Sequence, residues 1–191
     1  VAGDPWVAPI EALVREAASA GWEQWACVGT PADDPQPSVG ELPPERVRPL
    51  CFGAEGSKLP FALPGMSDVM PYPSSRFSAL TEEQLDRYLA AWRAHLVAAI
   101  EAARPQVIHC HHLWLVSSLL AELAPPIPVV AHCHATGLRQ RALAPKLAPL
   151  ADRGNARHPG YAVLHGDHAR LLRDELGVDE ARVAIVGAGY R

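Results

Sequence analysis

Hydrophobic and polar positions along the chain predict short strands and longer helices that follow one another in order. The clearest stretch is 107–139, which reads VIHCHHLWLVSSLLAELAPPIPVVAHCHATGLR. The apolar runs Val107-Ile108 and Val129-Val130 predict buried strands, and the apolar positions of Trp114 to Leu123 predict a helix between them. Two parallel strands joined by a helix form a right-handed βαβ unit, so we expect this stretch to organise the fold.

Two further helices are predicted from apolar stripes with helical spacing. The first covers Ala8 to Ala20 and is expected to stop at Gly21, a residue type that favours helix ends. The second covers Thr81 to Ala103, where Thr81 and Gln84 have the spacing of a capping box. We expect its apolar face to pack in the core, and this face consists of Leu85, Tyr88, Leu89, Trp92, Leu96 and Ile100.

The remaining segments alternate between predicted strands, helices and loops. We expect Gly29-Thr30-Pro31 to break the first short strand, Pro49 to mark an edge strand and Pro145 to interrupt a helix. Gly53 to Ser78 has no clear periodicity and is expected to be a functional flap or partly disordered. The predicted strands are Trp25–Val28, Arg46–Phe52, Tyr161–Leu164 and Val183–Val186, the helices are Leu138–Leu150 and Asp167–Leu176, and Asp152–Gly160 is a loop. This order predicts a three-layer α/β, Rossmann-like domain with a mostly parallel sheet and helices on both faces.

Composition narrows the class of protein. The chain has 191 residues, of which 49% are hydrophobic and 20% charged, as in a globular domain. A net charge of -4 argues against a nucleic-acid partner, and no apolar run is long enough for a transmembrane segment. The four cysteines are not spaced like a disulfide framework, and we find no signal peptide, so we expect a cytoplasmic protein with reduced thiols.

Polar residues gather where the two central strands are predicted to end. Five of the nine histidines lie there, in His109-Cys110-His111-His112 and His132-Cys133-His134. Alternate residues of a strand share a face, so we expect His111 and His134 to lie at one crevice, with the cysteines on the opposite face. Ligands of open α/β sheets bind beyond the carboxyl ends of the strands, which makes this edge the candidate site.

Three kinds of chemistry suit such a cluster. Imidazole and thiolate bind zinc, but His-Cys-His alternates between faces and no acidic residue is adjacent, so we expect no metal site. Nucleophilic catalysis by a cysteine is disfavoured because both strand cysteines are expected to be buried as small hydrophobic residues. Recognition of ligand hydroxyls or phosphates by neutral imidazoles and Thr136 fits best. We expect His109 and His132 to be structural, whereas His112 fits either role.

Several segments together carry a resemblance to a known family. Val107 to Leu115 reads as a strand that ends in His-x-His, and Pro128 to Arg139 as a strand followed by a His-Gly-Thr-Asp-Leu-Arg-like turn. Tyr161 to Leu164, Asp167 to Gly177 and Arg182 to Tyr190 read as the last elements before an interdomain linker. These features resemble the N-terminal domain of family 4 glycosyltransferases, which have the GT-B fold.

The resemblance implies retaining transfer of a sugar from a nucleotide-sugar donor to a small-molecule acceptor, without a metal cofactor. His134 matches the strand-end histidine that contacts the transferred sugar and is the expected catalytic residue. Ala135 and Gly137 stand where the family has glycine and aspartate. The expected substrate-binding residues are His111, Thr136, Arg139 and Gly3, the last in a turn that approaches the donor phosphates.

The resemblance also implies a domain organisation. Residues 1–191 are expected to form the single acceptor-side domain, with its first strand missing and the C-terminal donor-binding domain absent, so we expect the isolated chain to be inactive. The expected partners are the nucleotide sugar, the acceptor and the missing domain. The alternative is a non-catalytic small-molecule-binding α/β domain that uses the same crevice. A hydrolase is disfavoured because no serine lies in a glycine-flanked strand-to-helix turn.

Overall fold

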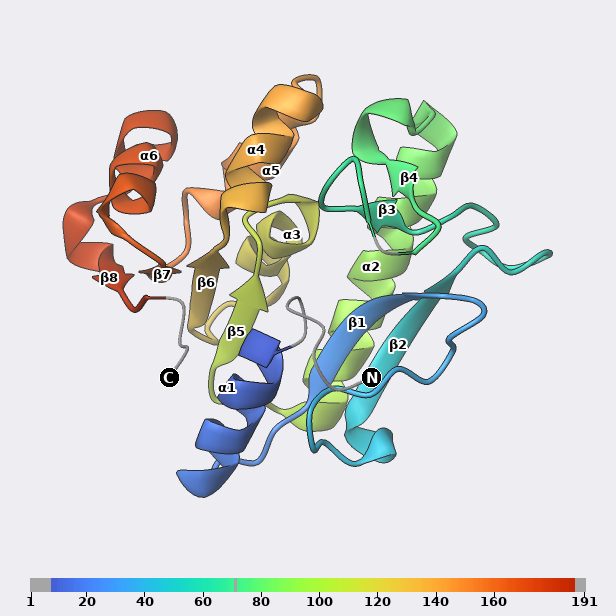
Figure 1. Ribbon diagram of the computed structural model, residues 1–191, viewed down its shortest axis with the longest axis horizontal. Coiled ribbons are helices and arrows are strands. Elements are labelled where there is room, and N and C mark those ends of the chain that lie inside the picture. Colours follow the sequence, from blue (N-terminus) through green and yellow to red (C-terminus); the bar gives the residue numbers. More distant parts are fainter. Residues whose placement is uncertain (1–7, 71, 188–191) are drawn as a thin grey trace. The chain divides into compact units, whose positions relative to one another are not determined.

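A computed structural model describes residues 8–70 and 72–187 of the chain (Figure 1). These residues divide between two compact units, the first reaching Leu63 and the second spanning Pro64–Gly187. Both units combine helices with parallel strands, which confirms the predicted mixed α/β, Rossmann-like fold class. In the described part of the chain, no helix is long and apolar enough to cross a membrane.

The first unit contains helix α1 (Ala8–Ser19) and the parallel strands β1 (Ala26–Pro31) and β2 (Val47–Phe52). Helix α1 confirms the predicted helix, and Gly21 follows it with a left-handed backbone at φ 82°. The predicted strand break at residues 29–31 is wrong, because these residues belong to β1 and pair with residues 50–52 of β2. Pro49 is accommodated because β2 pairs with one neighbour in this two-stranded sheet.

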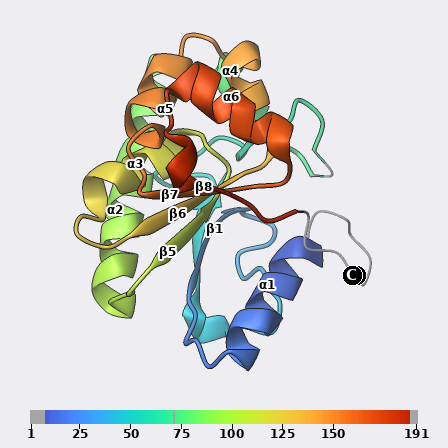
Figure 2. The ribbon, with the colours of Figure 1, turned by 90° about the vertical axis from the view of Figure 1, so that its left-hand side faces the viewer.

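The second unit is built on a four-stranded parallel sheet in the order β5-β6-β7-β8. Its strands are β5 (Ile108–His111), β6 (Val129–Cys133), β7 (Gly160–Val163) and β8 (Val183–Ile185), and its helices are α2 (Glu82–Ala103), α3 (Leu115–Leu123), α4 (Ala135–Leu143), α5 (Ala148–Asn155) and α6 (Gly166–Leu176). The succession β5, α3, β6 confirms the predicted βαβ unit. Figure 2 shows α2, α3 and α5 together on one side of β5 and β6. Because all four strands run in parallel, their carboxyl ends meet at one edge of the sheet.

Helix α2 begins as its sequence predicts. The backbone N–H of Gln84 donates to the Thr81 hydroxyl at 3.2 Å, and the N–H of Thr81 donates to the Gln84 side-chain oxygen at 3.0 Å. This capping box satisfies two donors that the first turn of a helix otherwise leaves unpaired. Tyr88, Trp92 and Leu96 are buried, so the predicted aromatic stripe is confirmed as core.

Helix α4 begins at Ala135, earlier than the predicted start at Leu138. The chain enters this helix directly from β6, with His134 still extended at φ -88° and ψ 143°. Gly137 allows the early start because the first turn of α4 runs close to the loop between β5 and α3. A Cβ atom at Gly137 would lie 2.7 Å from the backbone nitrogen of Leu113. The sequence pattern did not show this contact, which depends on the packing of two segments far apart along the chain.

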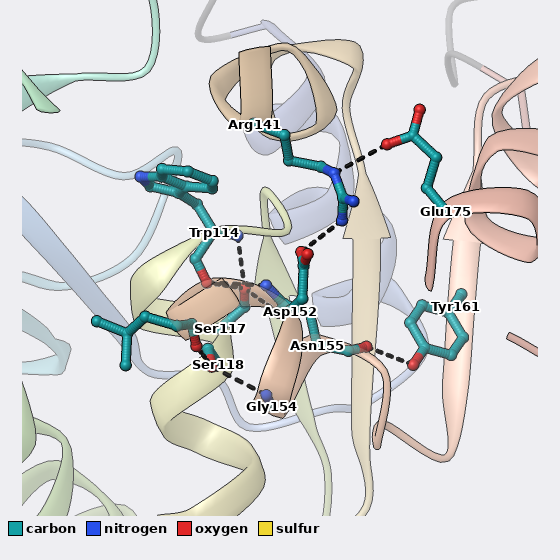
Figure 3. Close-up of polar contacts among 10 residues, drawn as sticks. Trp114, Ser117, Ser118, Arg141, Asp152, Gly154, Asn155, Tyr161 and Glu175 are labelled. Carbon is teal, nitrogen blue, oxygen red and sulfur yellow. Dashed lines mark hydrogen bonds and ion pairs between the residues drawn. The ribbon is translucent and has the colours of Figure 1, made fainter. Parts of the chain in front are cut away.

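Helix α5 follows the expected interruption at Pro145 but extends further than predicted. The loop predicted to begin at Asp152 is wrong over its first residues, because the helix continues to Asn155. The buried Asn155 side chain bonds to α3 (Figure 3). Ser117 Oγ donates to Asn155 Oδ1 at 2.6 Å, and Asn155 Nδ2 donates to the carbonyl oxygen of Trp114 at 3.0 Å. These partners hold the last turn of α5 in helical form.

An arginine connects three helices of the second unit. Arg141 on α4 contacts Asp152 on α5, with 2.5 Å between Nη1 and Oδ1, and Glu175 on α6, with 2.8 Å between Nε and Oε2 (Figure 3). The Arg141 side chain is only 20% exposed, so this pair of contacts is partly shielded from water. Burial raises the pKa of Asp152, although the Arg141 charge opposes that effect. The network fixes α4, whose first turn carries candidate site residues.

The segment without clear periodicity contains two short strands. β3 (Pro64–Gly65) and β4 (Ser75–Arg76) pair in parallel within the second unit. The buried Gln140 side chain on α4 donates from Nε2 to the carbonyl oxygen of Gly65 at 3.4 Å. The segment therefore has fixed contacts at β3, and its predicted role as a functional flap stays a prediction.

His158 makes the stability of the fold sensitive to acid. It is 1% exposed, and its burial lowers its pKa from 6.5 to about 4. Below pH 6.5 the unfolded chain therefore takes up a proton before the folded chain does, and folding stability falls until the pH reaches the folded-state pKa. For this group the loss at pH 5, relative to pH 7, is about 2 kcal/mol.

We expect the variant His158→Gln to lose less stability between pH 7 and pH 5 than the unmodified chain, by about this amount. Urea unfolding at both pH values measures the difference, and the lower stability of the variant at pH 7 cancels from it. Equal losses in the two proteins would contradict the prediction.

Candidate functional site

The site is built on the register between β5 and β6. Cys110 pairs with Ala131 and His111 with His132, so residues of the two strands alternate between faces in step. His109, His111 and His132 thereby share one face. The ring centroids of His109 and His132 are 5.4 Å apart, and those of His111 and His132 are 5.5 Å apart. Three imidazoles therefore form a stacked group at the end of these strands.

The predicted meeting of His111 and His134 is confirmed. His111 Nδ1 lies 3.1 Å from His134 Nε2, a hydrogen-bond distance that requires one ring to donate and the other to accept. His134 is the residue between β6 and α4, so its ring lies beyond the carboxyl end of a strand and before the first turn of a helix. This is the place where ligands of parallel α/β sheets bind.

Thr136 lies beside His112, for which the sequence allowed either a structural or a ligand-binding role. Its Oγ1 is 2.9 Å from His112 Nδ1, which joins the first turn of α4 to the end of β5. His112 has a left-handed backbone at φ 67°, an uncommon conformation for a residue with a side chain. Such strained residues cluster at functional sites, so His112 joins the candidate site.

Two predicted substrate-binding residues are not brought into this group. Arg139 is exposed on α4, and in the described part of the chain it makes no hydrogen bond or ion pair. Gly3 lies outside the described residues, so its predicted contact with donor phosphates stays a prediction. His111, His134 and Thr136 are thus the predicted site residues that come together.

Burial keeps the clustered imidazoles uncharged. Burial first, and then the proximity of the other histidines, lowers the pKa of His111 to about 3 and those of His132 and His134 to about 4. The pKa of His112 falls to about 4, again chiefly because its ring is buried. At pH 7 these rings are neutral, and each offers one hydrogen-bond donor and one acceptor.

The two cysteines beside the histidine cluster do not offer a nucleophile. All four are free, and Cys110 and Cys133 are buried on the strands, as the sequence predicted. Burial raises the pKa of each of these two thiols to about 12, so the reactive thiolate is not formed at neutral pH.

His168 is a candidate that sequence reasoning missed. It is buried in the first turn of α6, directly after β7, and is close enough to His134 to contribute to lowering the pKa of that ring. The signal was present in Gly166-Asp167-His168, which follows a third parallel strand and so reaches the same edge of the sheet.

The fold and the site define a class of protein. A parallel α/β domain with neutral imidazoles and a hydroxyl at the carboxyl edge of its sheet is suited to bind a polar small molecule there. Residues 10–190 match the family described as Glycosyltransferase Family 4. The chain therefore belongs to glycosyltransferase family 4, as the resemblance indicated. A comparison with curated proteins finds no match.

Proposed function

We infer that this chain is the acceptor-side domain of a retaining glycosyltransferase, which moves a sugar from a nucleotide sugar to a small-molecule acceptor. The observation that carries the proposal is the 3.1 Å contact between His111 Nδ1 and His134 Nε2 at the carboxyl edge of the sheet. In the transfer, the bond from the anomeric carbon to the nucleotide phosphate breaks, and the nucleotide leaves with the bonding electrons. A bond from that carbon to an acceptor oxygen forms, and the proton of the acceptor hydroxyl passes to the departing phosphate.

Each predicted site residue has a role in this transfer. His134 is the catalytic residue that contacts the transferred sugar. His111 contacts the Nε2 atom of His134 and thereby fixes which nitrogen of the His134 ring accepts a hydrogen bond. Thr136 supplies a hydroxyl within reach of the same edge, where it already contacts His112. Arg139 has an exposed guanidinium free to meet an anionic part of the substrate, and Gly3 is assigned to the donor phosphates.

Sugar transfer also needs a binding site for the nucleotide-sugar donor. We assign donor binding mainly to a second, Rossmann-like domain outside the sequence described here. The transfer itself is proposed to need no metal cofactor and no nucleic acid, and to take place in the cytoplasm. Isolated residues 1–191 are then expected to show no turnover.

A panel of nucleotide sugars tests the proposal on the full-length gene product and, beside it, on residues 1–191. Thermal stability reports binding, because a ligand that binds only the folded state raises the midpoint of unfolding, and nucleotide release reports transfer. Consumption of one nucleotide sugar by the full-length product alone supports the proposal. Stabilisation without consumption would favour the non-catalytic binding domain, and turnover by residues 1–191 would show that the assigned second domain is unnecessary.

A further inference from the structure

Three histidines of the sheet lie in an arrangement that suits a metal ion. One ring nitrogen from each of His109, His111 and His132 lies within 4.8 Å of the other two. His109 and His111 are two residues apart on β5 and therefore share a face, and His132 is the partner of His111 on β6. Adjacent strands supply the three ligands, so the sheet itself sets their spacing.

His132 provides a second and independent observation. The side chain is buried, and in the described part of the chain neither of its ring nitrogens has a hydrogen-bond partner. Leaving a buried polar group unpaired costs free energy, so such groups are rare unless something else satisfies them. Coordination of a metal ion by one nitrogen removes part of that cost.

The hydrogen bond between His111 and His134 can leave the other ring nitrogen of His111 available to bind a metal ion. When His111 Nδ1 carries the proton and donates to His134 Nε2, the lone pair of His111 lies on Nε2 and is available to a metal. Histidines that bind metals usually donate their other ring N–H to a neighbouring acceptor, which fixes the ring. His134 is that acceptor for the ring of His111.

The chemistry of the donors selects the ion. The cluster is made of imidazoles alone, because strand alternation places Cys110 with Ala131 on the opposite face and the group contains no carboxylate. Neutral imidazole suits zinc and its transition-metal neighbours, whereas calcium and magnesium prefer oxygen ligands. We propose that His109, His111 and His132 form a binding site for one zinc-like divalent transition-metal ion, with its fourth position open.

Binding of a metal ion requires the three histidine rings to move closer together. Nitrogens around a tetrahedral zinc ion are about 3.3 Å apart, given a zinc–nitrogen bond of about 2.0 Å. The separations of up to 4.8 Å therefore close by rotation of the rings, and the exposed ring of His109 is the most free to move. The inference rests on the geometry of the three rings and on the unpaired nitrogens of His132, so it does not depend on the proposed function although the two share His111.

Titration with Zn²⁺ tests the site, with Co²⁺ as a spectroscopic probe of the same ligands. In the 191-residue chain we expect one Zn²⁺ to bind, the midpoint of thermal unfolding to rise, and Co²⁺ to give the visible absorption of imidazole coordination. The variant His109→Gln removes an exposed ligand with little effect on the fold, and we expect it to weaken Zn²⁺ binding about tenfold or more.

Two further variants make the outcome decisive. His132→Phe keeps a buried ring but removes both nitrogens, so it should abolish the stabilisation by Zn²⁺ and retain the fold without the metal. His165→Gln is the matched control, because His165 is exposed and contacts His168 instead of the triad. Absence of Zn²⁺ binding, equal affinity in His109→Gln, or loss of binding in His165→Gln would each overturn the proposal.

Discussion

Replacing His134 with alanine should lower the rate of the proposed sugar transfer by the full-length gene product by about 100-fold or more. The change removes the ring that approaches His111 to 3.1 Å, at the edge where the transferred sugar is proposed to lie. A hydrogen bond that strengthens as charge develops in the transition state contributes to the rate, so its loss lowers kcat as well as kcat/KM. Initial rates of nucleotide release, measured with the donor found in the panel, give both constants.

Controls separate this effect from a loss of structure. His134→Asn keeps a short side chain with one donor and one acceptor, and we expect it to retain more activity than His134→Ala. His95→Ala removes a histidine on α2 that contacts Trp92, and we expect it to leave the rate unchanged. An unchanged kcat/KM in His134→Ala would contradict the assigned role, as would a loss fully explained by a lower midpoint of unfolding.

The sequence predicted those parts of the fold that depend on local signals. The capping box of Thr81 and Gln84 lies within one helical turn, and Gly177 ends α6 with a left-handed backbone at φ 64°, as its residue type favours. Predicted ends of helices and strands were wrong where contacts with a segment distant in the sequence set the actual end. Strand β1 continues through residues 29–31 because β2 pairs with it, and α5 continues to Asn155 because α3 supplies its partners.

In the candidate site, too, local sequence signals predicted some features, whereas contacts between distant segments determined others. The alternation of side chains along each strand, together with the expectation that the two strands are neighbours in a parallel sheet, predicted that His111 and His134 would lie together. Alternation within each strand also suggested that His-Cys-His splits its ligands between faces, which argued against a metal. The register across the two strands, which brings His109 and His132 together, cannot be obtained from either strand alone.

Replacing Gly154 with alanine should destabilise the fold by about 3 kcal/mol, because it inserts a methyl group where two helices touch. A Cβ atom at Gly154 would meet the backbone carbonyl of Ser118 on α3, with 2.7 Å to the carbonyl carbon and a shorter distance to its oxygen. Backbone atoms inside a helix cannot move aside separately, so α3 and α5 must separate. That separation would also lengthen the hydrogen bond from Gly154 N–H to Ser118 Oγ, which is now 3.1 Å (Figure 3). Urea unfolding measures the change.

Gly166→Ala is the matched control for this substitution. It lies in α6, its backbone is not left-handed, and no atom lies within 4 Å of an added Cβ, so alanine there should be neutral or stabilising by up to about 1 kcal/mol. The double variant Ser118→Ala with Gly154→Ala identifies the cause. Removing the Ser118 hydroxyl leaves its backbone carbonyl in place, so stability should not return. Recovery in the double variant would mean that the hydroxyl is the obstacle, and the close approach of the two backbones would then not be what requires glycine at this position.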